Sequence, residues 1–188
     1  MVVFLVALPI VIFRWAGRQH EKDSRAWVEL ARAHGLSFQL RPPRVSGVFE
    51  GAPLAIGLQV AGPASQMEIS TLVRGGPPAT RAEPDWLRVG PRGVSARLAA
   101  TLVSPGPVLE TGDAAFDERF LTRAVDGARA RAVLSDAVRA RLLAFPREVT
   151  LTCTSDALVL VWRHQESELG VLVEACRIVA YAYGGRAQ

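Results

Sequence analysis

The sequence predicts an α+β protein, in which an N-terminal membrane helix precedes one domain of antiparallel β-hairpins packed against amphipathic helices. Three observations lead to this class. The chain opens with an apolar run over residues 1–13, its middle alternates apolar and polar residues, and its last third holds a hairpin followed by an amphipathic helix. We therefore divide the chain into a transmembrane or membrane-anchor helix over residues 1–18 and a single soluble domain over residues 19–188.

The apolar N-terminus is short for a membrane span. At ~1.5 Å per residue, a helix over residues 1–16 is about 24 Å long, against a hydrocarbon core of ~30 Å. Trp15 stands where an interfacial aromatic side chain would anchor the helix, and a bilayer can thin locally. The alternatives are a buried helix or strand and a cleaved signal peptide, which lacks a positive n-region and a small-residue cleavage site here. We favour the anchor.

Positive charge follows the apolar run, at Arg14, Arg18, Lys22 and Arg25. Because this charge lies on the C-terminal flank, the positive-inside rule places the domain in the cytoplasm. The sequence thus predicts a single-pass protein of a bacterial inner membrane whose soluble domain faces the cytoplasm.

Composition is that of a globular protein, with 49% hydrophobic and 21% charged residues. These values exclude a wholly disordered chain. The net charge of +4 is a modest surplus, and it does not predict a nucleic-acid partner. Cys153 and Cys176 match no metal or redox spacing, so we expect buried free thiols in a reducing compartment, with a strand-to-helix disulfide as the alternative.

The first half of the domain predicts one helix and a set of strands. The helix is capped at Asp23 or Ser24 and ends at Gly35, with apolar positions at Trp27, Leu30, Ala31 and His34. Strands follow over residues 36–40, 45–49, 54–60 and 67–73, with a turn at 50–53 joining the second and third. Residues 75–78 and 90–93 are turn signals, and the stretch 94–98 is a further apolar segment.

The second half predicts helices before its hairpin. Phe116 and Phe120 are four residues apart, so a helical turn would place both on one face, and a strand over residues 120–123 follows. One short helix runs over residues 126–134, and a second is capped by Ser135 and ended by Pro146.

The last third gives the clearest pattern. Strands over residues 149–153 and 158–162 alternate apolar and polar side chains around a turn at residues 155–156. A helix then carries one apolar stripe until Gly184-Gly185, made of Leu169, Leu172, Val173, Cys176, Val179, Ala180 and Tyr183.

Three short motifs carry a resemblance to a known family. They are Trp27-Val-Glu-Leu-Ala-Arg-Ala-His34-Gly35-Leu36, Val45-Ser-Gly-Val-Phe-Glu-Gly51, and Thr111-Gly-Asp followed by Phe116-Asp117 and Phe120. Over most of residues 24–183 the chain resembles a family of uncharacterised bacterial membrane-anchored proteins, a domain of unknown function. The resemblance implies the anchored α+β layout and no particular activity.

An acidic group near a turn supplies the candidate metal ligands. Asp113 and Asp117, at i and i+4, could share a helix face and hold a divalent ion such as Mg²⁺. However, Arg119 and Arg123 lie close in sequence and can neutralise the carboxylates, and Asp113 is placed to cap a helix at Ala114. We favour capping and ion pairing, with metal binding as the alternative.

Other chemistry has weaker support. The chain holds no G-x-S-x-G, phosphate-loop or H-E-x-x-H motif. His34 suits a helix end, and His164 could contact a thiol although nothing in the pattern requires it. A basic group on the two middle helices is better explained as a solvated face than as a contact for nucleic acid or anionic lipid: Arg129, Arg131, Arg139 and Arg141.

Together these observations predict a membrane-tethered, non-enzymatic binding or assembly module whose partners are the membrane, through residues 1–18, and another protein. We expect no catalytic or cofactor-binding residues, no cofactor, no nucleic-acid partner and no small-molecule substrate. Two alternatives stay open: a metal-dependent hydrolase that uses Asp113 and Asp117, and a sensor of anionic lipid surfaces.

Overall fold

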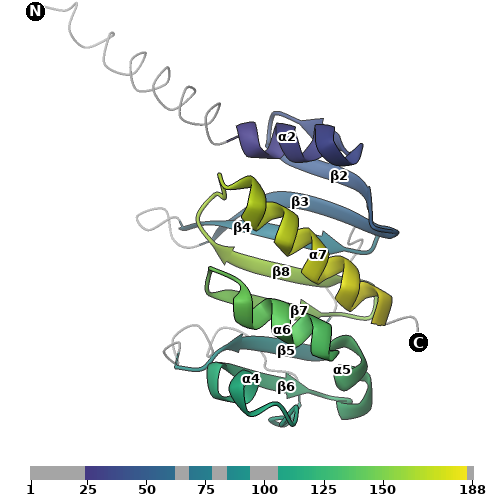
Figure 1. Ribbon diagram of the computed structural model, residues 1–188, viewed down its shortest axis with the longest axis vertical. Helices are drawn as coiled ribbons and strands as arrows, with labels where there is room; N and C mark the ends of the chain where they lie inside the picture. Colours follow the sequence, from purple (N-terminus) through teal and green to yellow (C-terminus); the bar gives the residue numbers. More distant parts are fainter. Residues whose placement is uncertain (1–23, 62–67, 78–83, 94–105, 186–188) are drawn as a thin grey trace, which may run out of the picture.

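An eight-stranded antiparallel sheet organises the chain (Figure 1), in the strand order β1-β2-β3-β4-β8-β7-β5-β6. The computed structural model describes residues 24–61, 68–77, 84–93 and 106–185. These residues form helices and antiparallel strands in one sheet, which confirms the α+β class. The membrane helix predicted over residues 1–18 lies outside the described residues.

The N-terminal half is one helix followed by a meander of strands: α2 (Arg25–His34), β1 (Ser37–Gln39), β2 (Arg44–Phe49), β3 (Ala52–Ala61) and β4 (Glu68–Gly75). Helix α2 ends at Gly35, whose φ of 65° is the left-handed conformation that glycine adopts without strain. These elements confirm the helix and the strands predicted from the periodicity. Met67, which was predicted to begin the fourth strand, lies outside the described residues.

The turn between β2 and β3 is shorter than the sequence predicts. Phe49 pairs with Ala52, so the turn contains just Glu50 and Gly51, with φ values of 47° and 82°. Positive φ at both positions is typical of the two-residue type I′ hairpin turn, whose twist matches that of the strands. The predicted four-residue turn was therefore wrong, because Ala52 and Pro53 already belong to β3.

Strand β5 (Leu87–Pro91) contains two residues that the sequence predicts as a turn, Gly90 and Pro91. They pair with Leu121 and Phe120 on the neighbouring strand, so the turn prediction was wrong for them and applies to Arg92 and Gly93 alone. The pairing of β5 with β7 stops at Val89, so Pro91 lies at the strand end, where its missing N–H is tolerated. The predicted apolar segment 94–98 lies outside the described residues.

The C-terminal half confirms the predicted order of helices and hairpin: α4 (Ala114–Arg119), β6 (Phe120–Ala124), α5 (Gly127–Val133), α6 (Asp136–Ala144), β7 (Val149–Cys153), β8 (Leu158–Arg163) and α7 (Leu169–Gly185). Phe116 and Phe120 stack with ring centroids 4.9 Å apart and are both buried. Phe120 belongs to β6 and not to the helical turn, so the contact spans a helix-to-strand junction.

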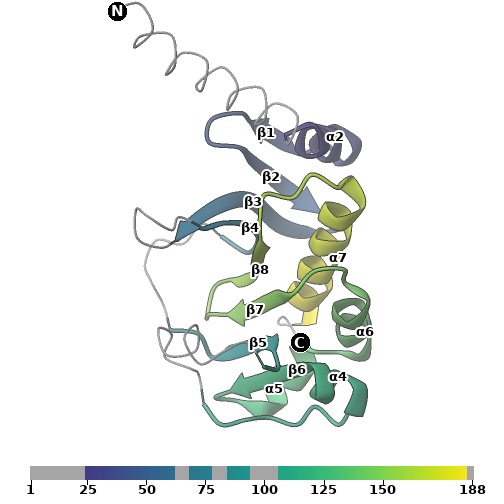
Figure 2. The ribbon, with the colours of Figure 1, turned by 90° about the vertical axis from the view of Figure 1, so that its left-hand side faces the viewer.

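Helix α7 lies along one face of the sheet, on the same side as α6 (Figure 2). Its fully buried side chains include Leu172, Cys176 and Val179, which confirms most of the predicted stripe. The helix approaches β4 closely at Gly75, where an added Cβ would lie 2.7 Å from the Val179 Cγ1 atom. The core of the domain therefore sits between this helix layer and one face of the sheet.

Candidate functional site

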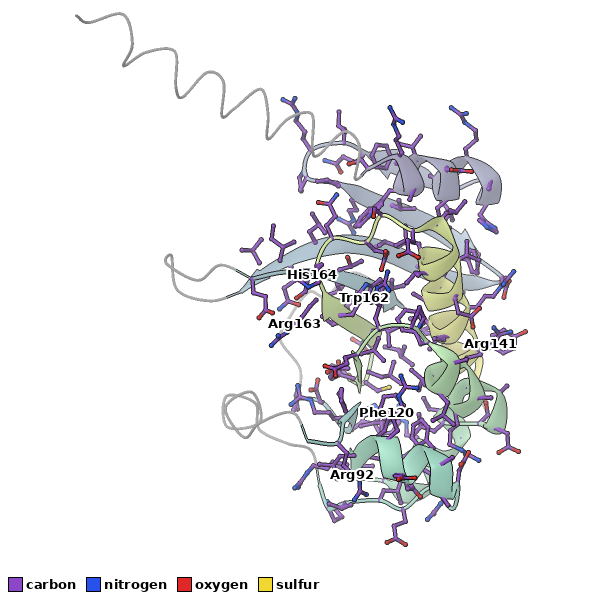
Figure 3. The ribbon with its side chains drawn as sticks, turned by 60° about the vertical axis from the view of Figure 1, so that its left-hand side comes forward. Arg92, Phe120, Arg141, Trp162, Arg163 and His164 are labelled. Atoms are coloured by element: carbon purple, nitrogen blue, oxygen red, sulfur yellow. The ribbon has the colours of Figure 1, made fainter. Side chains whose placement is uncertain are left out.

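The second face of the sheet is not covered by any described helix (Figure 2), and we call it the open face. Alternation along the strands decides which side chains reach it. On β8, Trp162 is buried against the helix layer, whereas Arg163 is exposed, and Figure 3 shows the two side chains on opposite sides of the strand. The open face is thus built from every second residue of each strand.

The strand register places a continuous row of side chains across this face, which we call the arginine row. Each residue pairs with the next on the neighbouring strand, from β6 at one edge to β1 at the other: Arg123, Arg88, Thr152, Val159, Arg74, Ala55, Ser46 and Ser37. The row contains three arginines and no acidic residue. With strands ~4.8 Å apart, Arg74 lies roughly 14 Å from Arg88.

The arginine side chains keep donors available. Arg74 uses Nε for the Pro77 carbonyl at 3.0 Å, and Arg123 uses one terminal nitrogen for the Gly106 carbonyl at 3.5 Å. A guanidinium group has five N–H donors, so each of these side chains can still bind an acceptor. The open face is therefore suited to contact carboxylates.

Arg88 differs from its neighbours because it is partly enclosed. It stands directly opposite Arg123, and like charges in that position repel each other. An ion pair of 3.6 Å with Asp85 offsets this repulsion, although partial burial raises the pKa of the Asp85 carboxyl. The Nε of Arg88 is buried and has no hydrogen-bond partner among the described residues. Positive charge at this position is thus incompletely neutralised within the described part of the domain.

A second row on the open face is small and apolar, and we call it the apolar row. It comprises Leu121, Gly90, Thr150, Val161, Leu72 and Gly57, all of which are partly exposed. The arrangement resembles the composition of protein interfaces, in which an apolar centre is bordered by arginine.

The carboxylates of Asp113 and Asp117 accept hydrogen bonds from backbone amides at the start of α4 and in the loop before it. Asp113 Oδ1 accepts from the Phe116 amide at 3.2 Å, which confirms the predicted cap of α4. Asp117 accepts from the amide of Thr111 at 3.0 Å and from that of Gly112 at 3.3 Å. Both carboxylates therefore serve backbone donors, a structural role that does not require an ion.

The ion-pair partner predicted for these carboxylates was wrong. Asp113 pairs with Arg139 of α6 at 3.3 Å, and not with Arg119 or Arg123. Arg119 instead donates to the carbonyls of Leu143 and Phe145. The Phe116 amide, followed by Arg139, lowers the pKa of the Asp113 carboxyl. No group of three or more His, Cys, Asp or Glu side chains in the described ranges is arranged to hold a metal ion.

Among the described residues, Cys153 and His164 are too far apart to form a catalytic pair. Cys153 and Cys176 are both fully buried and form no disulfide, so the alternative of a disulfide between them was wrong. Burial raises the pKa of Cys176 to about 12, which disfavours the nucleophilic thiolate. Cys153 pairs with Leu158, and His164 follows the end of β8, six residues after Leu158 and roughly 20 Å away. The His34 ring contacts the Phe49 ring in a tilted arrangement, with ring centroids 4.7 Å apart.

The basic residues of the middle helices are engaged within the domain. Arg129 lies over the Trp86 ring at 4.2 Å, and Arg131 donates to the Glu110 carbonyl. Arg141 pairs with Glu174 at 2.6 Å, and the side chain of Arg139 is 13% exposed. The expectation of a simple solvated face was therefore wrong for Arg139.

Glu166 is a buried carboxylate that the sequence analysis did not single out. Its side chain accepts hydrogen bonds from the Trp162 indole at 3.1 Å, from the Arg147 guanidinium at 3.2 Å, and from the amides of Ser167 and Glu168. These donors satisfy the carboxylate, so its role is to fix the segment before α7. The sequence pattern did not signal its burial, although three of these donors lie within four residues of it; the more distant partner is Arg147, 19 residues earlier.

Comparisons with protein-family models, with curated proteins and with solved structures yield no match. The resemblance to bacterial membrane-anchored proteins therefore stays a prediction. Among the described residues, no helix has both the length and the apolar character needed to cross a bilayer.

Proposed function

We propose that the chain is a membrane-tethered, non-enzymatic binding module. In this proposal, residues 1–18 hold the domain at a bacterial inner membrane, and the domain faces the cytoplasm. Its open face binds a protein partner whose surface carries carboxylates around an apolar patch. The observation that carries the proposal is the arginine row beside the apolar row on a sheet face without a described helix.

Charge complementarity favours an acidic partner over a basic or neutral one. Three guanidinium groups lie in one row, and the row itself holds no acid to neutralise them. A partner that supplies carboxylates would gain charge-assisted hydrogen bonds and would relieve the repulsion between Arg88 and Arg123. The apolar row next to them would add buried area at the centre of the contact.

The non-enzymatic part of the proposal rests on how the candidate catalytic groups are used. Asp113 and Asp117 bind backbone amides, and Cys176 is a buried thiol of raised pKa. Groups engaged in this way favour a structural role over acid–base or nucleophilic chemistry.

Photo-crosslinking in cells tests the proposal. A benzophenone amino acid placed at Thr150 reports on the open face, and one at Tyr181, which is 48% exposed on α7, reports on the helix layer as a control. We expect a protein adduct from Thr150, none from Tyr181, and loss of the adduct when Arg74→Glu and Arg123→Glu are combined. The matched charge reversal is Arg131→Glu, since Arg131 also donates to a carbonyl but lies on α5.

The membrane fraction is analysed in the same experiment. Recovery of the protein in the supernatant after high-speed centrifugation would contradict the tether. Adducts that survive the double charge reversal, or that form equally from both positions, would contradict the assignment of the open face.

A further inference from the structure

The end of the domain formed by α2 and the β1–β2 turn carries a group of arginines without acidic partners. Arg25 and Arg32 belong to α2, and Arg41 and Arg44 border the turn. All are exposed, and none forms an ion pair with a described residue. Elsewhere in the described domain, by contrast, several arginines form ion pairs with acidic residues: Arg88, Arg139, Arg141, Arg147, Arg163 and Arg177.

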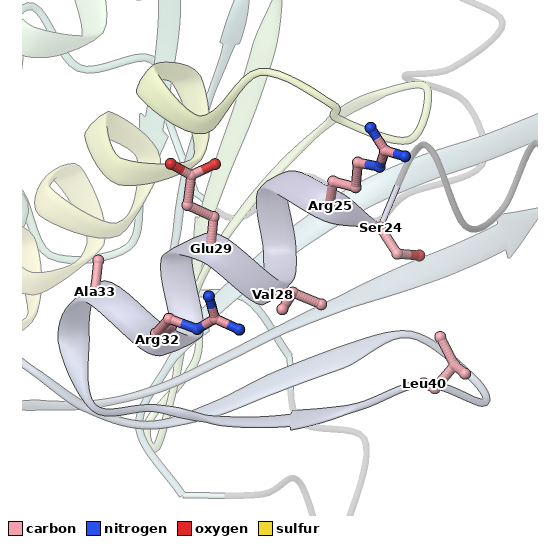
Figure 4. A pocket seen from close by; sticks show the side chains of 7 residues that line it. All are labelled: Ser24, Arg25, Val28, Glu29, Arg32, Ala33 and Leu40. Carbon is pink, nitrogen blue, oxygen red and sulfur yellow. The ribbon is translucent and has the colours of Figure 1, made fainter.

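Acidic residues at this end offset only part of the charge. Glu50 pairs with Arg177 of α7 at 3.5 Å. Glu29, which lies between Arg25 and Arg32 on α2, forms no ion pair with a described residue (Figure 4). The α2 end therefore presents a net positive surface that the fold itself does not use.

An apolar groove lies within this positive surface. The space between α2 and the β1–β2 turn has a volume of about 560 Å³ and is lined by Ser24, Arg25, Val28, Glu29, Arg32, Ala33 and Leu40. Leu40 is 49% exposed and extends from the turn toward the side of α2 that carries Val28 (Figure 4). Guanidinium groups thus border exposed aliphatic side chains, a combination that suits the interface between lipid headgroups and acyl chains.

The connection to the N-terminal segment limits how far this end can lie from a bilayer. The chain enters the described domain at Ser24, and residues 19–23 separate it from the predicted anchor. Five extended residues span at most about 17 Å. If residues 1–18 are in the membrane, the α2 end must therefore lie within about two Debye lengths of it, since the Debye length is ~8 Å at physiological salt.

We propose that the α2 end docks on an anionic bilayer, with Leu40 at the depth of the headgroups and Arg25, Arg32, Arg41 and Arg44 on the lipid phosphates. This inference rests on the proposed tether and adds a second contact. It orients the sheet so that β1 lies toward the membrane and β6 away from it, which leaves the open face accessible from the side.

A fluorescent probe of membrane depth tests the docking on the full chain. Leu40→Cys carries an environment-sensitive label, and Val108→Cys is the matched control, because Val108 is 50% exposed and bridges to β6 at the opposite end of the sheet. Cys153 and Cys176 are buried, so labelling of the native protein is confined to the new thiol.

Each labelled protein is reconstituted into vesicles of phosphatidylcholine alone and of phosphatidylcholine with phosphatidylglycerol. We expect a blue shift of the Leu40 label in the anionic vesicles, and no shift of the Val108 label. The shift should be lost in ~1 M salt, where the Debye length falls to ~3 Å. Combining four charge reversals should also abolish the blue shift of the Leu40 label: Arg25→Glu, Arg32→Glu, Arg41→Glu and Arg44→Glu. Circular dichroism checks that this variant is folded.

Flotation of the vesicles separates the two proposals. A protein that floats with both kinds of vesicle but gives the same Leu40 emission in each overturns the docking and leaves the tether in place. A protein that floats with neither overturns the tether, and the docking with it. Free phosphate added to the anionic vesicles should leave the shift intact, whereas competition by phosphate would overturn the assignment to a lipid surface.

Discussion

The indole Nε1 of Trp27 donates a 2.7 Å hydrogen bond to the backbone carbonyl of Glu166, 139 residues later in the chain. Both groups are buried. The contact holds α2 against the segment that enters α7, and the Thr71 hydroxyl reinforces that segment by accepting from the Glu166 amide at 2.8 Å and donating to the His164 carbonyl at 2.6 Å. Helix α2 is thereby attached to the C-terminal part of the domain, just before α7.

Replacing Trp27 with Phe should destabilise the domain. The ring would still fill much of the site, but the Glu166 carbonyl would lose its donor in a buried position, at a cost of about 1–3 kcal/mol. Urea denaturation followed by circular dichroism measures this loss. Tyr181→Phe, at an exposed position, should change the free energy of unfolding by less than about 0.5 kcal/mol. Equal effects would contradict the role assigned to the indole.

Replacing Glu166 with Gln should have a larger effect than Trp27→Phe. The carboxylate accepts from the Trp162 indole, from Arg147 and from two amides, and an amide group would turn N–H donors toward some of them. Loss of one partner from a buried ion pair destabilises a protein by about 3 kcal/mol. The free energy of unfolding of Glu166→Gln, compared with Glu168→Gln at a 65% exposed side chain, checks this expectation.

Asp113→Asn should remove a pH-dependent contribution to stability. The Phe116 amide and then Arg139 lower the pKa of Asp113 below its ordinary value of 3.8. Because the folded pKa is the lower one, the ionised carboxylate stabilises the fold at pH above 3.8, and this contribution is lost as the pH falls through the folded pKa. The variant should melt below the wild type at neutral pH, and the difference should narrow as the pH falls below 3.8. A difference in melting temperature between variant and wild type that stays the same at every pH would contradict this account.

Cys176 should be inert to thiol reagents in the folded protein. Its pKa is raised to about 12 by burial, so at pH 8 it is a thiol without access to solvent. We expect a colorimetric thiol assay to report no fast-reacting cysteine in native protein and both Cys153 and Cys176 in denaturant. Val108→Cys supplies the positive control for an exposed thiol. Rapid native labelling would mean that the helix layer opens readily.

Divalent ions should leave the melting temperature unchanged if the carboxylates of α4 serve the loop. A ligand that binds the folded state raises stability by mass action, so Mg²⁺ or Mn²⁺ at a true site would shift the calorimetric transition. Asp117→Ala should instead lower the melting temperature with or without metal, because Thr111 and Gly112 lose their acceptor. A metal-induced rise that Asp117→Ala abolishes would support the hydrolase alternative.

Local patterns predicted most elements of the fold. The β7–β8 hairpin and α7 follow from alternation and helical spacing among neighbouring residues, which do not depend on distant contacts. The turns at residues 50–53 and 90–93 were misplaced because proline and glycine were read as turn signals in both. Pro53 is tolerated near the start of β3, and Pro91 at the end of β5, where a missing N–H has little effect.

The candidate site could not be predicted in the same way. The arginine row exists because β4 pairs with β8 and β5 pairs with β7, and neither pairing joins strands that are neighbours in sequence. Arg74, Arg88 and Arg123 look like unrelated surface positions until that register is known. The pair between Asp113 and Arg139 has the same cause, since nearby Arg119 and Arg123 were the more obvious partners along the chain.

Strand β8 lies between β4 and β7, although it is the final strand in the chain. During translation, strands β1 to β4 emerge first. The edge of β4 that pairs with β8 in the folded domain stays unpaired until β8 leaves the ribosome. Unpaired strand edges invite association with other chains. The nascent protein is therefore most exposed to aggregation in the interval before β8 has emerged from the ribosome.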